Sequence, residues 1–536
     1  MIAQVLLSLL LVVQVLADYV PVKGPCPAKP LVRPANGISD DEETFRVARK
    51  AVADEALKKW FLKTNSVFGT TDLPTVAMTT SGGSYRSLLS GAGVIQALDD
   101  RDSAVSTSGL YQALTYQAGL SGGGWLLSSL AGNNYPTVRF LKEQLWKEAF
   151  RDSALDPGKF LVGAAYGEIL SSVARKEKAG YDTTLGDAWG RLLSYQLLRG
   201  PWGGVSTTLS SVTGFSNFTS HAVPFPIITA LGVKTFLGEC KPGPNATTYE
   251  FSPFEFGSFD KDVSAFNPTK YLGTTMEAGK PVGTCTTNYD NLGYILGTSS
   301  SLFHKICLPS PAQNPLTDLT RTLTGLINKI HKVTSSDLYA TYRNPFYSYI
   351  SPTATSNPAN NISAQETLNL VDGGDALQNN PIFPLLQPSR NISVILVNDN
   401  SADTSANFPN GTEILTTYIQ SLSAGLTRMP FIPSVSTFLA QNLTTRATFF
   451  GCGDAEKATI VYLPNTAYTY ASGTPTVKLT YTEKETDAMI ANGVGIGTQG
   501  GDGEWGTCLA CAVMMKSGQA LPAECEACFE RYCYYE

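Results

Sequence analysis

The chain has 536 residues, enough to bury a large core, and its length alone would allow about three domains. Charged residues make up 16% of the chain, against about 25% in ordinary soluble domains, and the formal net charge is −6. Because the chain is mildly acidic and carries no basic stripe, we expect no nucleic acid partner.

The first expected element is a secretory signal peptide over residues 1–17. The apolar run from Val5 to Leu16 is too short to span a membrane, and it ends at the small residue Ala17. No Lys or Arg precedes this run, so an uncleaved anchor stays open as the alternative. No later stretch reaches the roughly 18 apolar residues that a transmembrane helix needs. We therefore expect no transmembrane segment, and one large domain with insertions over residues 18–536.

Two further features agree with export. The ten cysteines are an even number, as expected for disulfide bonds in an oxidising compartment. Six sequons for N-glycosylation are present, at Asn217, Asn245, Asn361, Asn391, Asn410 and Asn442. Attached sugars would supply the solubility that the low charge content does not.

A helix is expected over residues 44–62. Ser39 and Glu42 precede it with the spacing of a capping box. Its buried stripe is predicted to consist of Val47, Ala51, Leu57, Trp60 and Phe61. This helix is interpreted as structural.

The next unit is a strand, a glycine turn and a helix. Residues 76–80 form a short apolar strand, and Ser81-Gly82-Gly83-Ser84-Tyr85-Arg86 leads from it into a helix. Such a turn places backbone N–H groups at a helix N-terminus, where they can hold an anion. Gly82 and Gly83 would let a substrate oxygen approach closely, which suits an oxyanion hole. A tight turn without a ligand is the alternative. A phosphate-binding P-loop is excluded, because no Lys-Ser or Lys-Thr pair ends the turn.

A second unit of the same kind follows. The strand over residues 111–117 leads into Gly119-Leu120-Ser121-Gly122-Gly123, which has the Gly-x-Ser-x-Gly pattern of a nucleophile elbow. A serine on that turn projects its hydroxyl above the edge of the sheet, and the following helix points its positive end at developing negative charge. Two strand, turn and helix units in succession predict an α/β fold.

Residues 196–300 are rich in Gly, Ser, Thr and Pro and are weakly periodic. They are interpreted as loops and short strands, either a cap over a site or a plain surface insertion.

The chain offers few candidates for the base that a nucleophilic serine needs. Its three histidines, His221, His304 and His331, all follow Ser121 and precede Asp372, an order that no familiar catalytic triad has. Asp372 ends an apolar stretch and precedes two glycines, and partial burial would raise its pKa and make it a better proton acceptor. A plain turn is the alternative for this Asp.

The tail over residues 508–533 carries two Cys-x-x-Cys pairs. This spacing resembles a zinc ribbon, but an exported chain favours disulfides, whose pairing the spacing does not determine.

The three motifs, in this order, resemble the fungal lysophospholipase (phospholipase B) family, which shares its catalytic core with cytosolic phospholipase A and patatin-like enzymes. Several other segments carry the same resemblance: 253–258, 379–382, 401–404, 409–412, 449–452 and the cysteine-rich tail. The resemblance covers nearly the whole mature chain. It implies an α/β fold with a central mixed, largely parallel sheet flanked by helices, and with loop-rich insertions that form a cap.

The resemblance also implies the roles of the site residues. Ser121 would be the nucleophile and Asp372 its base, a Ser-Asp dyad without histidine. Gly82 and Gly83 would donate N–H groups to the oxyanion, and Gly122 is a further candidate from the elbow geometry. Arg86 would face the substrate phosphate, with a surface salt bridge as its alternative role. No metal and no cofactor is expected, and calcium should not be needed for the chemistry.

The implied function is hydrolysis of fatty-acyl esters of lysophospholipids and phospholipids at membrane or micelle surfaces, through an acyl-enzyme. The expected location is extracellular, with retention in the cell wall left open. Two other classes stay open, an esterase of other acyl esters and a non-catalytic cell-wall glycoprotein. Arg86 argues against the first, and intact Ser121 and Asp372 argue against the second.

Overall fold

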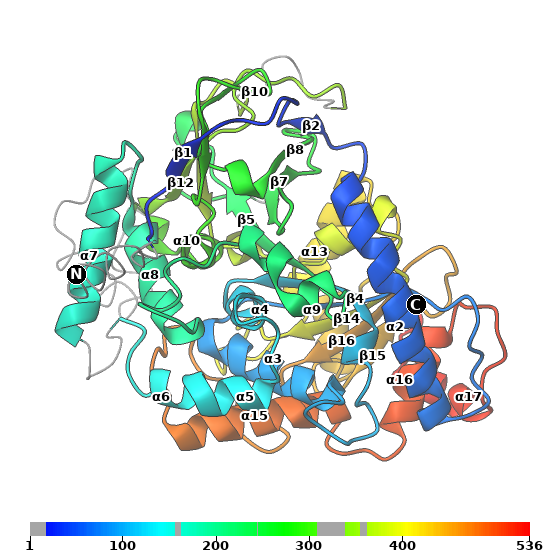
Figure 1. Ribbon diagram of the computed structural model, residues 1–536. Helices are drawn as coiled ribbons and strands as arrows, with labels where there is room; N and C mark the ends of the chain where they lie inside the picture. Colours follow the sequence, from blue (N-terminus) through cyan, green and yellow to red (C-terminus); the bar gives the residue numbers. More distant parts are fainter. Residues whose placement is uncertain (1–17, 156–161, 244, 308–337, 354–361) are drawn as a thin grey trace, which may run out of the picture.

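The computed structural model describes residues 18–536 except 156–161, 244, 308–337 and 354–361 (Figure 1). The predicted signal peptide, His331 and the sequon at Asn361 lie outside the described residues. Within the described part of the chain, no helix is both long and apolar enough to cross a membrane.

One twelve-stranded mixed sheet organises the molecule. Ten of its strands follow one another in the order β15 (Thr448–Phe450), β16 (Thr459–Pro464), β14 (Val394–Asp399), β3 (Val76–Thr80), β4 (Leu114–Leu120), β5 (Phe225–Gly232), β6 (Thr248–Phe251), β7 (Glu255–Ser258), β8 (Ala265–Pro268) and β2 (Arg33–Pro34). The other two, β12 (Ala340–Arg343) and β13 (Thr367–Val371), pair with each other, and β13 also pairs with β5.

The predicted α/β fold with a mixed central sheet is confirmed. Its parallel part is the run β16-β14-β3-β4-β5 in the middle, and every pairing outside this run is antiparallel. These middle strands are buried along their length, as parallel strands covered on both faces are. The region 196–300 does contain short strands, and four of them, β5 to β8, extend the central sheet.

Helices cover the sheet on both faces. In Figure 1, α3 (Ser84–Leu98), α5 (Val138–Leu141) and α15 (Glu483–Thr498) gather below the strands, while α2 (Asp40–Thr64) and α16 (Trp505–Met514) lie on the right. The backbones of α3 and α15 touch, since a Cβ on Gly93 would lie 2.0 Å from the Ile490 carbonyl oxygen. The remaining α-helices are α4 (Gly122–Gly132), α6 (Lys147–Ala149), α7 (Val162–Lys178), α8 (Leu185–Leu197), α9 (Ser216–Thr219), α10 (Leu292–Ser299), α12 (Phe383–Leu386), α13 (Thr412–Ala424), α14 (Val435–Ala440) and α17 (Glu524–Tyr532).

The first long helix differs in part from its prediction. It runs from Asp40 to Thr64, and Ser39 accepts the predicted N-cap bond from the Glu42 N–H at 3.2 Å. Glu42, however, directs its carboxylate to Arg390 at 2.8 Å, so the second half of the capping box is absent. The predicted buried stripe is also wrong at Val47, which is 55% exposed, and at Ala51.

Arg49 occupies the buried face of α2 instead. Its guanidinium is fully buried because it donates to the carbonyl oxygens of Leu114, Gln112 and His221. A buried cation is tolerated where its N–H groups are all met by acceptors.

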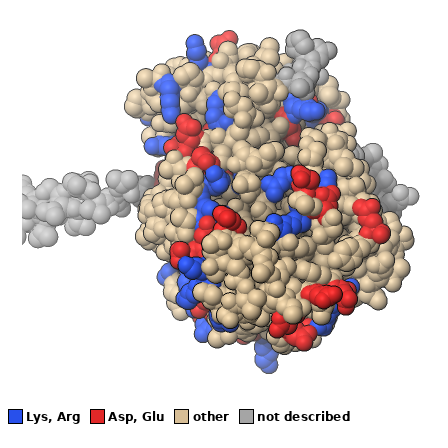
Figure 2. Space-filling view, turned by 90° about the vertical axis from the view of Figure 1, so that its right-hand side faces the viewer, with Lys and Arg blue, Asp and Glu red and all other residues tan. Residues whose placement is uncertain are grey.

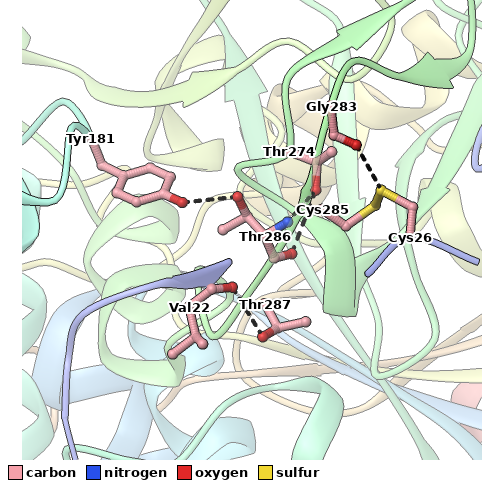
Figure 3. The surroundings of a disulfide bond; sticks show 8 residues. All are labelled: Val22, Cys26, Tyr181, Thr274, Gly283, Cys285, Thr286 and Thr287. Carbon is pink, nitrogen blue, oxygen red and sulfur yellow. Dashed lines mark hydrogen bonds between the residues drawn. A yellow bond between two sulfur atoms is a disulfide. The ribbon is translucent and has the colours of Figure 1, made fainter. Parts of the chain in front are cut away.

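Disulfides tie both ends of the chain to the body of the protein. The short strand β1 (Val22–Gly24) pairs with β11 (Cys285–Thr287), and the Cys26–Cys285 bond fastens this pair (Figure 3). Beside it, Tyr181 shares a hydrogen bond with Thr286, and the Thr287 hydroxyl donates to the Val22 carbonyl oxygen (Figure 3).

The cysteine-rich tail is crosslinked, as predicted over the zinc alternative. Its bonds are Cys508–Cys528, Cys511–Cys525 and Cys452–Cys533. The first two join α16 to α17, and the third joins the tail to the segment after β15. Two-residue strands, β9 (Met276–Glu277) and β10 (Lys280–Pro281), form a separate small hairpin.

Candidate active site

Ser121 lies on a strained turn between β4 and α4. Its backbone has φ 50° and ψ −119°, a conformation that is costly for any residue other than glycine. The turn needs its glycines, since a Cβ on Gly123 would lie 2.1 Å from the Thr80 carbonyl oxygen. The Ser121 N–H is held by the Ser299 hydroxyl at 2.9 Å, which in turn donates to the Thr229 carbonyl oxygen at 2.8 Å. This is the geometry of a nucleophile elbow.

The sheet brings Asp372 to Ser121 although 251 residues separate them. Strand β4 pairs with β5 as far as Leu120 and Thr229, and then turns away into α4. From Leu231 onward, the edge of β5 that β4 has left is paired with β13, in which Val371 is the partner of Leu231. Strand β6 pairs with the opposite edge of β5. Ser121 directly follows the end of β4, and Asp372 directly follows the end of β13. The two residues therefore lie together at the place along β5 where β4 ends and β13 begins to pair.

The two side chains lie next to each other. The Ser121 hydroxyl is close enough to the Asp372 carboxylate to favour its ionised form, and each residue is 5% exposed. The Gly374 N–H donates to Oδ1 of Asp372 at 2.8 Å, and the Asp372 N–H donates to the Ser301 carbonyl oxygen at 3.0 Å. Burial, followed by the negative charge of Asp375, raises the pKa of Asp372 to about 7. A carboxyl group with that pKa can exchange a proton near neutral pH.

Asp375 is part of a charged cluster that the sequence did not indicate. Its carboxylate lies 2.9 Å from Nε2 of His304 and 3.0 Å from Nζ of Lys305. Burial opposes ionisation of Asp375, but these two partners together hold its pKa below the ordinary value. His304 therefore lies behind the site, on Asp375 and not on Ser121.

His221 is far from this chemistry. It follows α9 in a left-handed conformation, and its ring packs against Phe45 at 5.1 Å.

The glycine turn between β3 and α3 lies beside the elbow. Gly83 has φ 137°, which L side chains rarely adopt, and a Cβ on Gly122 would lie 2.1 Å from the Ser84 carbonyl oxygen. Within the described residues, the N–H groups of Gly83 and Gly122 have no hydrogen-bond partner. Both are therefore available to a developing oxyanion.

The N–H of Gly82 is occupied, unlike those two. It donates to Asn379, to the side-chain oxygen at 3.0 Å and to the carbonyl oxygen at 3.2 Å. The Asn379 amide group donates back to the Gly82 carbonyl oxygen at 3.1 Å and to the Ser401 hydroxyl at 2.9 Å. Asn379 thus holds the Gly82 peptide on both sides, a contact that the sequence did not indicate.

Arg86 lies beside the glycine turn and is 1% exposed. Its Nε donates to the Asn400 carbonyl oxygen at 2.9 Å, and its Nη1 donates to Thr474 and Thr476. Burial lowers its pKa to about 10, which leaves it charged at neutral pH. A Cβ on Gly83 would lie 2.7 Å from Nη2, and within the described part of the chain this nitrogen makes no hydrogen bond. One edge of the guanidinium is therefore fixed, and the other is free beside the turn.

An apolar pocket opens at Ser121. Its volume is about 490 Å³ with its mouth included, and its walls are mostly aromatic and aliphatic. The residues that line it besides Ser121 are Ser84, Trp125, Leu155, Trp189, Ser300, Leu302, Phe303, Thr476, Val477 and Leu479. Trp125 and Trp189 are fixed, because both indole N–H groups donate to the Ser300 hydroxyl, at 3.0 and 3.1 Å. The enclosed part of this space is only about 40 Å³, so its apolar lining suits the part of a hydrocarbon chain nearest the ester.

No group of three or more His, Cys, Asp or Glu side chains suited to hold a metal ion is present in the part of the chain that the structure describes.

The fold and the turn that carries Ser121 define an α/β hydrolase-like protein with a serine at its nucleophile elbow. A family model described as the lysophospholipase catalytic domain matches residues 76–536. The chain belongs to this family, so the resemblance found in the sequence is confirmed.

Curated relatives agree over nearly the whole chain. Lysophospholipase 1 of Aspergillus fumigatus is 37% identical over 560 residues, which covers 96% of this chain and 87% of the relative. The lysophospholipase of Torulaspora delbrueckii is 37% identical over 548 residues, covering 94% and 83%. The structure of human GIVD cytosolic phospholipase A2 matches with a TM-score of 0.69 and 18% identity, over 91% of this chain and 69% of that one. This last likeness concerns the fold.

Proposed function

We propose that the protein hydrolyses fatty-acyl esters of lysophospholipids and phospholipids, with Ser121 as nucleophile and Asp372 as its base. The observation that carries this proposal is the placement of the Ser121 hydroxyl beside the Asp372 carboxylate at the mouth of an apolar pocket. Membership of the lysophospholipase family supports the substrate class.

The first half of the reaction forms an acyl-enzyme. As the Ser121 oxygen attacks the ester carbonyl carbon, its proton passes to Asp372, and the carbonyl π electrons move onto oxygen. The N–H groups of Gly83 and Gly122 stabilise that oxyanion. The tetrahedral intermediate collapses, the alkoxide of the lysolipid or glycerophosphodiester leaves, and protonated Asp372 returns the proton to it.

The second half uses water in place of the serine hydroxyl. Asp372, again ionised, accepts a proton from water, whose oxygen attacks the acyl carbon. Collapse of the second tetrahedral intermediate breaks the bond to Ser121, which recovers its proton from Asp372 while the fatty acid leaves. The same carboxylate serves as base and then as acid in each half, and a pKa near 7 suits both tasks.

Substrate orientation follows from the two sides of Ser121. The hydrocarbon chain would enter the pocket between Trp125 and Trp189, and the free edge of Arg86 would face the phosphate with a charge-assisted bond. The alternative substrate class, an uncharged acyl ester, would leave this buried cation without a partner at its free edge. That contrast favours a phospholipid.

We further propose that the protein is secreted and N-glycosylated. Disulfides support an oxidising compartment. Of the sequons within the described residues, Asn245, Asn391 and Asn442 are exposed, and Asn217 and Asn410 are partly buried. Recovery of the protein from the culture medium, with a loss of mass after endoglycosidase treatment, would test both statements.

The decisive experiment is release of fatty acid from lysophosphatidylcholine by the purified protein, compared with Ser121→Ala. We expect the variant to fold, with an unchanged melting temperature, and to be inactive. If it retains more than a few per cent of the activity, a barrier change below roughly 2 kcal/mol, Ser121 is not the nucleophile.

A further inference from the structure

A second hollow lies at the opposite end of the parallel strands from Ser121. Thr75, Val394 and Thr459 line it, and they lie at the amino ends of β3, β14 and β16. Its volume is about 1510 Å³ against about 490 Å³ for the pocket at Ser121, open mouths included. Its other walls come from helix α2, the segments 70–74, 391–393 and 455–457, Arg428, and the end of α16 with the segment after it. Figure 2 shows this side of the molecule, with Lys and Arg side chains gathered around a depression and several acidic side chains among them.

The lining is rich in cations although the chain as a whole is acidic. Six basic residues line the hollow: Arg46, Lys50, Lys58, Arg428, Lys457 and Lys516. Three acidic residues accompany them: Asp54, Glu55 and Asp72. The lining therefore has a formal charge of +3 in a protein of net charge −6.

Most of these cations are not neutralised by a carboxylate. Lys50 pairs with Asp54 and Arg46 pairs with Glu43, both along α2. Lys457 and Lys516 donate only to backbone carbonyl oxygens, those of Thr427 and Lys457, each at 2.7 Å. The side chains of Lys58 and Arg428 make no hydrogen bond and no ion pair within the described residues. Four of the six cations thus lack an ion-pair partner.

Two of the unpaired cations, Arg428 and Lys516, are half-buried and line the same hollow. Burial lowers the pKa of Lys516 to about 8; the charge of Asp454 opposes this change, and the charge of Arg428 adds to it in smaller measure. Burial lowers the pKa of Arg428 as well. Bringing two cations together out of water costs free energy, which a bound anion would recover.

We propose that this hollow binds a phosphate group, held by the guanidinium of Arg428 and the ammonium groups of Lys516 and Lys58. A guanidinium matches phosphate oxygens in a two-pronged arrangement, and an ammonium adds a point charge. A phosphate monoester carries up to two negative charges at neutral pH, which suits several unpaired cations better than a carboxylate does. The site is independent of the hydrolytic reaction, because it lies at the other end of the sheet.

The test is a calorimetric titration of the protein with phosphate compounds at constant ionic strength. Inorganic phosphate and glycerol 3-phosphate represent the free anion. Phosphatidylcholine vesicles with and without phosphatidic acid represent a lipid headgroup and are used with the Ser121→Ala protein, which should not consume them. We expect saturable binding either of the free phosphate compounds or of the vesicles that contain phosphatidic acid. Which of the two binds shows whether the natural ligand is a free phosphate or a lipid headgroup.

Matched double variants assign the binding to the hollow. Arg428→Gln with Lys516→Gln should weaken it by about tenfold or more, the loss of two charge-assisted contacts. Arg199→Gln with Lys241→Gln removes the same charge from exposed positions elsewhere and should leave it within about twofold. A second phosphate bound at Arg86 would remain in both double variants. Binding that is unchanged in both is therefore assigned to Arg86 and not to the hollow.

The sequon residue Asn391 also lines the hollow, so the titration is repeated with Asn391→Gln to remove any glycan from the rim. The proposal is supported if the parent or the Asn391→Gln protein binds phosphate saturably and this binding is lost when Arg428→Gln and Lys516→Gln are added. The proposal is overturned if neither protein binds phosphate saturably in any arm, or if the two double variants, with melting temperatures like that of the parent, bind equally well.

Discussion

Asp375 lies close enough to Asp372 for its negative charge to raise the pKa of that carboxyl group. Burial makes the larger contribution, and the pKa of Asp372 reaches about 7. His304 and Lys305 lie against Asp375, at 2.9 and 3.0 Å, and the charge of Lys305 offsets only a small part of the rise in the pKa of Asp372.

This relationship predicts the pH dependence of hydrolysis. Only ionised Asp372 can accept a proton, so kcat/KM should rise with pH and level off above about pH 7. Asp375→Asn removes the neighbouring negative charge and should move this rise to lower pH. Asp41→Asn, at an exposed position on α2, is the control and should leave it in place. A profile that stays unchanged in Asp375→Asn would refute the coupling.

The histidines should be dispensable for the chemistry. His304 lies against Asp375 and His221 packs against Phe45, so we expect neither to accept the Ser121 proton. His304→Gln and His221→Gln should each keep activity within about tenfold of the parent, whereas loss of a true catalytic base costs several orders of magnitude. Fatty acid release from lysophosphatidylcholine measures this. A folded but inactive His304→Gln protein would show that the dyad assignment is wrong.

Asp372→Asn should exchange activity for stability. The amide cannot take the proton, so turnover should be lost. Because the folded-state pKa lies above the ordinary 3.8, the folded protein binds this proton more tightly than the unfolded chain, and its stability falls as pH rises from about 4 to 7. The full penalty, on the order of 4 kcal/mol for a shift of this size, applies above pH 7. Asp372→Asn should therefore melt at a higher temperature than the parent at pH 8, and this advantage should disappear near pH 4.

Arg86 holds neighbouring segments together, and we propose that it also recognises the substrate phosphate. Arg86→Ala removes the bonds to Asn400, Thr474 and Thr476, so some activity should be lost on every substrate. The loss on lysophosphatidylcholine should exceed the loss on an uncharged short-chain ester by about tenfold, because only the former carries a phosphate. Thr476→Val removes one of these bonds and keeps the cation, so it should affect both substrates alike. Equal losses in Arg86→Ala would leave Arg86 with a structural role alone.

Asn379 should position the glycine turn. It holds both polar groups of Gly82, which precedes the proposed oxyanion donor Gly83. Asn379→Ala should lower kcat by about tenfold or more with little change in KM, since the turn is needed most in the transition state. Gln378→Ala changes the adjacent residue as a control. If kcat is retained in a folded Asn379→Ala protein, the contact is not needed for catalysis.

Local patterns were enough to predict the two strand, turn and helix units, because glycine requirements and apolar periodicity are properties of neighbouring residues. The strand at Val76–Thr80 and the helices after both turns lie where expected. The strand before Ser121 begins at Leu114 and ends at Leu120, three residues later than predicted, because residues 111–113 form a 3-10 helix. Asp372 follows a strand as its sequence position suggested, but its role as the base was proposed from the resemblance to the family.

Contacts between distant segments could not be predicted in this way. Asn379 reaches Gly82 across 297 residues, and His304 reaches Asp375 across 71, and neither pair has a local signature. The predicted stripe of α2 is confirmed at Leu57, Trp60 and Phe61, and it was wrong at Val47 and Ala51 for a related reason. Arg49 can be buried because its guanidinium donates hydrogen bonds to three carbonyl oxygens of other segments. A pattern of apolar residues along one helix contains no information about such acceptors.

The order of strands in the sheet also has a consequence for biosynthesis. Strand β3 pairs with β4 soon after both are made, but its other edge waits for β14, which begins 314 residues after β3 ends. At 5–20 residues per second a ribosome needs roughly 15 to 60 s to reach it. During that interval the strand that leads into the glycine turn has an unpaired apolar edge, a template for pairing with other chains. The nascent chain should therefore depend on chaperones until residues 394–399 have emerged.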